Sequence, residues 1–223
     1  MLITVYFQGI SSNPTSAMLI PLQVSQYTYG ESGASACTVI AGTMLKLLLG
    51  RLKVDTLPTE ASELGDVVRA GVLHYQSLPS AMRNHLAIDE LGTYMTEDLH
   101  CKGVLQGLLS TRNHFEDLFE QARACSNPTD HIGIIITKPP ETVCVILPPV
   151  SCPAHLKKYI LFDSHSRPQL GLSGSYLYLS ENQVDIVRRL EGLFTPLPME
   201  RGSEADFMQQ MYNMFDGSVF QSK

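Results

Sequence analysis

The feature that most constrains this chain is a loop rich in Gly and Ser, residues 30–35, that runs directly into an apolar segment. Apolar residues between 39 and 49 surround a helix rather than lining one stripe, so they predict a buried helix that ends near Gly50. Cys37 stands at the junction of loop and helix. The positive end of a helix dipole favours the thiolate, which is the nucleophilic form of cysteine. Cys37 is therefore a candidate nucleophile, although a lone cysteine in an apolar context is more often a small core residue.

The size and charge of the chain predict one large domain with neither a nucleic-acid-binding surface nor a membrane span. The chain has 223 residues, of which 44% are hydrophobic, and this is enough for one large domain. The net charge is −6 and no basic cluster is longer than Lys157–Lys158 or Arg188–Arg189, which argues against a nucleic-acid surface. No apolar run approaches the roughly 18 residues that would span a bilayer, so we expect no membrane span.

The cysteines predict free thiols rather than disulfides or a metal site. They form an odd number, lack CxxC spacing and are not grouped with histidines at zinc-ligand spacing. We therefore expect a reducing compartment, the cytoplasm and also the nucleus, and no metal or other cofactor. The five cysteines are Cys37, Cys101, Cys125, Cys144 and Cys152.

Hydrophobic periodicity predicts a helical first half followed by strands, which is an α+β class with helices segregated from an antiparallel sheet. After the Cys37 helix, further helices are expected over 59–72, 80–93, 99–109 and 113–125. Strands are expected at 131–137, 142–147, 158–163 and 175–179, the first two forming a hairpin. The last predicted elements are helices over 181–192 and 203–215.

These elements are predicted to form one domain over residues 10–200. Residues 201–223 are predicted to add a C-terminal helical appendage. Tyr6–Gly9 resembles the end of an engineered protease site, so we interpret residues 1–9 as either a cloning remnant or a flexible N-terminus.

A second polar group stands where the strand at 158–163 ends. Residues i and i+2 of an extended chain point to the same face, so Asp163 and His165 can hydrogen-bond to each other. The carboxylate would fix the imidazole tautomer and leave the other ring nitrogen for a thiol, which with Cys37 completes a triad for acyl transfer. The six other histidines lack an Asp or Glu two residues away on a predicted strand. Alone, Asp163 and His165 are equally typical of a turn before Pro168.

Two short motifs give the chain a resemblance to a known family. The first is the loop Gly30–Cys37, and the second is Phe162–His165, which follows an apolar hairpin. The segment between residues 22 and 195 resembles the papain-like deubiquitinating cysteine peptidase domain at the N-terminus of herpesvirus large tegument proteins. The resemblance implies a papain-like fold of viral or cellular origin, with the nucleophile at a helix N-terminus.

The resemblance also implies roles for individual residues. Cys37 would be the nucleophile, His165 the general base and Asp163 the residue that orients it. The family uses a glutamine upstream of the cysteine in its oxyanion hole, and Gln26 fits that context better than the alternative, Gln23. Donors of this kind lower the barrier by roughly 3–4 kcal/mol.

Three functions remain open at this point. The first is a cysteine isopeptidase that cleaves after the C-terminal Gly-Gly of ubiquitin, with ubiquitin or ubiquitin-conjugated proteins as partners. The second is an inactive peptidase fold that binds ubiquitin or serves as a scaffold. The third is a cysteine peptidase that acts on another protein. Apolar surface on the middle helices or the C-terminal segment would meet ubiquitin or other domains of a larger parent protein.

Overall fold

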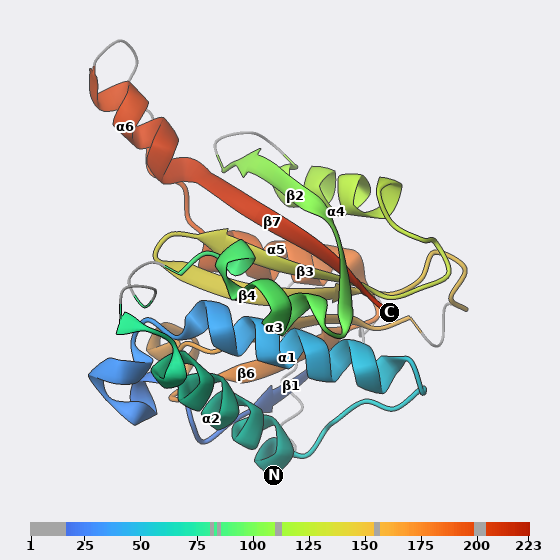
Figure 1. Cartoon of the computed structure of the whole chain (residues 1–223). Coiled ribbons are helices and arrows are strands. Elements are labelled where there is room, and N and C mark those ends of the chain that lie inside the picture. The colour runs from blue at the N-terminus through green and yellow to red at the C-terminus, as the bar shows by residue number, and fades with distance from the viewer. Residues whose placement is uncertain (1–16, 81–82, 84–85, 110–112, 154–156, 199–203) are drawn as a thin grey trace.

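The centre of the fold is an antiparallel sheet of seven strands in the order β1-β6-β5-β4-β3-β7-β2 (Figure 1). The computed structural model describes residues 17–80, 83, 86–109, 113–153, 157–198 and 204–223. The strands are β1 Met18–Pro21, β2 Leu99–Leu108, β3 Ile132–Lys138, β4 Glu141–Leu147, β5 Tyr159–Asp163, β6 Tyr176–Ser180 and β7 Met214–Ser222.

Helices cover both faces of this sheet. The α-helices are α1 Cys37–Leu52, α2 Ala61–Ser77, α3 Gly92–Thr96, α4 His114–Ala124, α5 Gln183–Leu193 and α6 Glu204–Asn213. Short 3₁₀ helices are η1 Gln26–Tyr29, η2 Glu31–Gly33, η4 Ile88–Leu91 and η6 Pro168–Leu170. The helices α1 and α2 lie on one face of the sheet and α4 and α5 on the other (Figure 1).

The alternation of side chains along β4 divides the core into two halves. Cys144 and Ile146 belong to the hydrophobic cluster beneath α1, whereas Val143 and Val145 belong to the cluster beneath α4 and α5. Successive residues of a strand point to opposite faces, so a strand covered on both sides is apolar at every position. This explains why the central strands read as continuous apolar runs.

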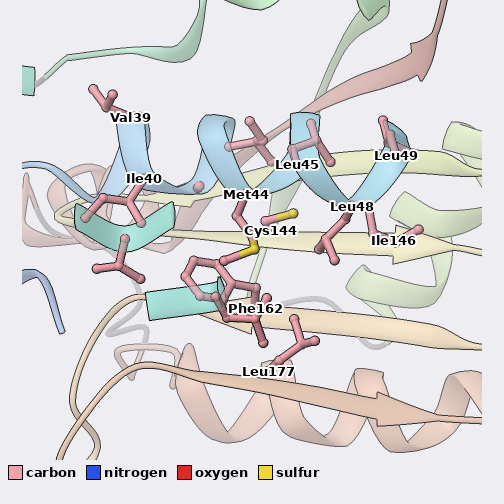
Figure 2. Close-up of a cluster of buried hydrophobic side chains, with 14 of the residues drawn as sticks. Val39, Ile40, Met44, Leu45, Leu48, Leu49, Cys144, Ile146, Phe162 and Leu177 are labelled. Carbon is pink, nitrogen blue, oxygen red and sulfur yellow. The ribbon is translucent and has the colours of Figure 1, made fainter. Parts of the chain in front are cut away.

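Helix α1 is buried between the sheet and α2, as its apolar residues predict. Met44, Leu45 and Leu48 are fully buried. Met44 and Leu48 face the strands that carry Cys144 and Phe162 (Figure 2), and Leu45 packs against Gly133 of β3. On the other side, a Cβ atom at Gly71 of α2 would lie 2.8 Å from the Cα of Ile40. The glycine therefore lets the two helices pack closely, and α1 becomes a rigid support for its first residue, Cys37.

Most of the predicted elements after residue 113 are confirmed. The strands β3, β4, β5 and β6 and the helices α4 and α5 lie within a few residues of the predicted bounds. The hairpin is also confirmed, because β3 and β4 pair antiparallel from Ile132 with Leu147 to Lys138 with Glu141. A mixture of helices with an antiparallel sheet is therefore correct as the class of fold.

The predicted helix over 99–109 is wrong, because this segment is the strand β2. It pairs with β7 along its length, from Leu99 with Ser222 to Leu108 with Met214. Gly103 adopts a φ of +147°, which lies outside the helical range, and glycine weakens a helix interior. Because β1 and β2 both lie in the first half of the chain, the predicted segregation of helices from strands is also wrong.

The predicted helical appendage over 201–223 needs a second correction. Helix α6 exists, and it projects away from the sheet (Figure 1). The residues after it form β7, which lies inside the sheet between β3 and β2. The sheet therefore extends past residue 200, because its strand β7 ends at Ser222.

Some predictions lie partly or wholly outside the described residues. Residues 1–9 are one such segment, and positions 81–82 and 84–85 of the predicted helix 80–93 are another. What is described of the latter contains η4 and the start of α3 rather than one long helix. Among the helices that the structure describes, none is long and apolar enough to cross a membrane.

Candidate active site

The end of β5 and the start of α1 meet on one side of the sheet. Cys37 is the first residue of α1, and Asp163 is the last residue of β5. Because α1 packs across β4 and β5, its N-terminal end comes close to the residues that follow Asp163. The two motifs singled out in the sequence, 126 residues apart from Cys37 to Asp163, therefore converge.

The carboxylate of Asp163 accepts two hydrogen bonds from His165, one from the ring and one from the backbone. The Nδ1 of His165 donates to Oδ1 of Asp163 at 2.6 Å, and the backbone N–H of His165 donates to the same oxygen at 2.9 Å. Both side chains are buried, with 0% and 3% exposed. This fixes the ring, since Nδ1 is committed to the carboxylate and Nε2 is left for the thiol of Cys37.

The environment favours a charged pair of Cys37 and His165. Burial raises the pKa of the Cys37 thiol, but the hydrogen bond and charge of His165, with hydrogen bonds from Thr142, hold that pKa below its usual value. Burial opposes charge on the imidazole as well, but hydrogen bonds to Asp163 and Cys37 raise the pKa of His165 to about 9. The arrangement thus favours a thiolate beside an imidazolium.

Cys144 shows what burial does without such partners. It is fully buried in the apolar core beneath α1, and desolvation alone raises the pKa of its thiol far above the ordinary value. Cys144 therefore has the properties of an inert core cysteine, whereas Cys37 has those of a reactive one. The two buried cysteines therefore differ in their polar contacts, which Cys144 lacks among the contacts described and Cys37 makes with His165 and Thr142.

The segment that joins β3 to β4 covers the other side of the thiol. In the protonated form of Cys37, its Sγ donates to the carbonyl oxygen of Pro140 at 3.7 Å. Two residues on, the hydroxyl of Thr142 lies 3.1 Å from that of Thr38 and 3.2 Å from that of Thr137. The thiol is therefore enclosed by α1, by the residues after β5 and by the start of β4.

The structure separates the two candidate glutamines. Gln26 is buried, and its Oε1 accepts from the hydroxyl of Ser164 at 2.9 Å while its backbone N–H donates to the Ser164 carbonyl at 3.1 Å. Its Nε2 donates to the carbonyl of Ala34 at 2.8 Å, which uses one of the two amide hydrogens. Gln23 is exposed. Of these two glutamines, both of which the structure describes, Gln26 is the one with hydrogen bonds to the segment that carries Asp163 and His165.

Glycine allows the loop before Cys37 to close on Gln26. A Cβ atom at Gly33 would lie 2.1 Å from the carbonyl oxygen of Gln26, a distance that no side chain can occupy. Gly30 adopts a φ of +71°, in the left-handed region that glycine tolerates best. Glycine is therefore required at positions 30 and 33 of this loop, at the first by backbone conformation and at the second by close packing.

Sequence reasoning missed a buried arginine beside the triad. Nε of Arg167 donates to Oδ2 of Asp163 at 2.7 Å, and its two terminal nitrogens donate to the carboxylate of Glu141 at 2.9 and 2.8 Å. The signal was present in the spacing, because Asp163, His165 and Arg167 alternate. Glu141 carried no comparable signal, since only the fold brings β4 next to this segment.

Tyr27 is an exposed aromatic residue next to His165. Its ring centroid lies 6.1 Å from that of His165, and 49% of the residue is exposed. Partial burial and the negative charge of Glu141 raise the pKa of its phenol. Within the described ranges, the structure contains no cluster of three His, Cys, Asp or Glu residues that could hold a metal ion.

Comparison with known proteins adds a likeness of fold. No family model matches the chain, and no curated protein matches its sequence. Among solved structures, the chain is similar to the ubiquitin-specific protease encoded by a tegument protein of murine cytomegalovirus, solved in complex with a ubiquitin-based suicide substrate. The TM-score is 0.59 with 16% sequence identity, over 91% of this chain and 84% of that one.

Proposed function

We propose that this protein is a papain-like cysteine deubiquitinase that cleaves after the C-terminal Gly-Gly of ubiquitin. The observation that carries the proposal is the hydrogen-bonded series from Cys37 to His165 to Asp163, with the cysteine at the N-terminus of a buried helix. This is the arrangement that nucleophilic acyl transfer requires: a nucleophile, a base within reach and a group that orients the base.

The chemistry follows from the positions of the groups. The Cys37 thiolate attacks the carbonyl carbon of the last glycine, and the negative charge that develops on the oxygen meets backbone N–H groups at the start of α1 and the side-chain amide of Gln26. His165 gives its proton to the departing lysine amine. It then removes a proton from the water that hydrolyses the thioester, which releases ubiquitin and restores Cys37.

Ubiquitin as the substrate is supported by the fold. The solved structure to which the chain is similar is a ubiquitin-specific protease with a ubiquitin-based substrate bound. Cleavage after Gly-Gly would require a channel too narrow for side chains, through which only glycine could pass. Ubiquitin-conjugated proteins are included among the partners, because an isopeptidase of this kind releases ubiquitin from them.

The test uses ubiquitin whose C-terminal carboxylate is replaced by a thiol-reactive electrophile. We expect the protein to become covalently labelled, and we expect Cys37→Ala and His165→Ala to abolish labelling while circular dichroism shows a retained fold. Cys101→Ala removes an exposed cysteine on β2 and serves as the matched control, with unchanged labelling.

Three other outcomes would contradict the proposal. Binding of ubiquitin without labelling would indicate an inactive peptidase fold that serves as a binding module. Neither binding nor labelling, in a protein whose Cys37 still reacts with a small alkylating reagent, would indicate a cysteine peptidase for another protein. Unchanged turnover in His165→Ala would reject the triad.

A further inference from the structure

The buried guanidinium of Arg167 connects the two halves of the site. The residue is 7% exposed and lies between two carboxylates, Asp163 after β5 and Glu141 at the start of β4. Its three hydrogen bonds to them measure between 2.7 and 2.9 Å. A guanidinium is a rigid fork, so this geometry sets the distance and the orientation of both carboxylates.

On the side of the base, Arg167 determines how the Asp163 carboxylate is turned. Oδ1 accepts both hydrogen bonds from His165, while Oδ2 accepts the hydrogen bond from Arg167 Nε. Because Asp163 is 0% exposed, rotation of the carboxylate would leave a buried N–H group without a partner. The imidazole is therefore held through the carboxylate by Arg167.

On the side of the nucleophile, the bidentate pair with Glu141 anchors the start of β4. The residues on either side of Glu141 both contact the thiol: the Pro140 carbonyl accepts from Sγ of Cys37, and Thr142 donates to it. A shift of Glu141 would therefore move the groups that surround the sulfur. Arg167 is the described side chain that joins this segment to Asp163.

We propose that the Arg167–Glu141 ion pair is a positioning element of the catalytic site, which holds the His165 base and the Cys37 thiol at reacting distance. The inference rests on the proposed function, since it concerns the same triad. Neither residue touches the reacting atoms directly in this role. A displacement of about 1 Å within such a site lowers the rate on the order of a hundredfold.

The experiment compares Arg167→Gln and Glu141→Gln with the unmodified protein. We expect the rate of labelling by the ubiquitin electrophile to fall about a hundredfold in Arg167→Gln and about tenfold in Glu141→Gln. The control is Arg51→Gln, which removes an exposed ion pair with Glu63 between α1 and α2 and should leave the rate unchanged.

A second readout separates positioning from charge. The reactivity of Cys37 toward iodoacetamide is measured against pH by mass spectrometry of its peptide, which gives the pKa of the thiol. His165 acts on that thiol directly, and the Tyr27 phenol interacts with Cys37 as well as with Asp163, Arg167 and Glu141. Removal of the Glu141 charge alone would favour the thiolate and lower the pKa. We expect the opposite, a raised pKa in Glu141→Gln, because the imidazolium is no longer held beside the sulfur.

Failure of the positioning role can be distinguished from failure of the proposed deubiquitinase function. If the unmodified protein is labelled and Glu141→Gln is labelled at the same rate with an unchanged or lowered thiol pKa, the positioning role is overturned while the triad stands. If the unmodified protein is not labelled at all, the proposed function fails first. Because Arg167→Gln removes a buried charge and is prone to unfold, the result for the partly exposed Glu141 decides the matter.

Discussion

At Cys37, burial and hydrogen-bonding partners act in opposite directions. Burial raises the pKa of a thiol, and the same effect makes Cys144 inert. The partners of Cys37 outweigh burial, because His165 and Thr142 both stabilise the thiolate. The difference between the two buried cysteines therefore lies in polar contacts rather than in depth, and it is the physical basis for assigning the nucleophile.

The pH dependence of turnover tests this charged pair. Burial opposes charge on His165, but hydrogen bonds to Asp163 and Cys37 raise its pKa from 6.5 to about 9, so the imidazolium is present below about pH 9 and is lost above it. The pKa of Cys37 is lowered, so the thiolate forms as the pH rises through that lower value. We expect a bell-shaped kcat/KM on a fluorogenic ubiquitin amide, with the alkaline decline near pH 9. A decline centred near pH 6.5 would mean that Asp163 does not support the imidazolium.

Gln26 gives a second prediction at the scale of a residue. If its amide binds the developing oxyanion, Gln26→Ala lowers kcat about a hundredfold and changes KM little. Gln23→Ala, at an exposed position, should have no effect on kcat. Steady-state kinetics with the same ubiquitin amide measures both.

A control variant distinguishes the role of the Gln26 amide from that of the Ser164 hydroxyl that holds it in place. Ser164→Ala removes the hydroxyl that donates to Oε1 of Gln26 but keeps the amide itself, so we expect a smaller loss of kcat than in Gln26→Ala. Equal losses in Gln23→Ala and Gln26→Ala would reject Gln26 as the oxyanion donor.

Among the elements, the loop that ends at Cys37 depends on close packing at Gly33. A Cβ atom there would overlap the carbonyl oxygen of Gln26, so Gly33→Ala must displace either η1 or η2. We expect labelling by the ubiquitin electrophile to slow by about tenfold or more, because the displacement moves both Gln26 and Cys37.

The matched control for Gly33 is Gly50 in the last turn of α1. A Cβ atom at Gly50 meets open space, and alanine favours a helix over glycine by roughly 0.5–1 kcal/mol. Gly50→Ala should therefore leave labelling unchanged and raise the melting temperature slightly. Equal labelling by the two variants would show that the loop does not need its close contact.

The sequence predicts an element well where its pattern is local. The continuous apolar run of β4 and the helical periodicity of α4 and α5 depend on residues within each element, and all three elements are confirmed. The pattern of β2 is ambiguous between helix and strand, and its pairing with β7 depends on residues more than 100 positions away. The site follows the same rule, since Asp163 and His165 are recognisable by spacing, whereas Glu141 is brought there only by the sheet.

At the scale of the molecule, the last strand completes the sheet. β7 lies between β3 and β2, so the C-terminal segment stabilises the domain rather than adding to it. Phe215 of β7 is 2% exposed, and its ring centroid lies 5.2 Å from that of Phe115 in α4. The core on the α4 side of the sheet is therefore closed by the end of the chain.

This arrangement predicts that alanine substitutions at two phenylalanines close in sequence change the free energy of unfolding by different amounts. Phe215→Ala should lower the free energy of unfolding by about 3–5 kcal/mol, because it leaves a cavity in the core. Phe207→Ala, on the projecting helix α6 where the residue is 64% exposed, should change it by less than about 0.5 kcal/mol. Urea denaturation measures both. Equal and small effects would mean that β7 contributes little to the stability of the domain, as expected of the C-terminal appendage that the sequence predicts over 201–223.

The most direct test of the account is to locate the covalent bond that the ubiquitin electrophile forms. The chain offers five cysteines, and three of them, Cys101, Cys125 and Cys152, are at least partly accessible. Peptide mapping of the labelled protein by mass spectrometry should find one ubiquitin per chain, attached to Cys37 alone. Attachment to Cys101, Cys125 or Cys152, or the absence of any adduct in the folded protein, would contradict the assignment of Cys37 as the nucleophile.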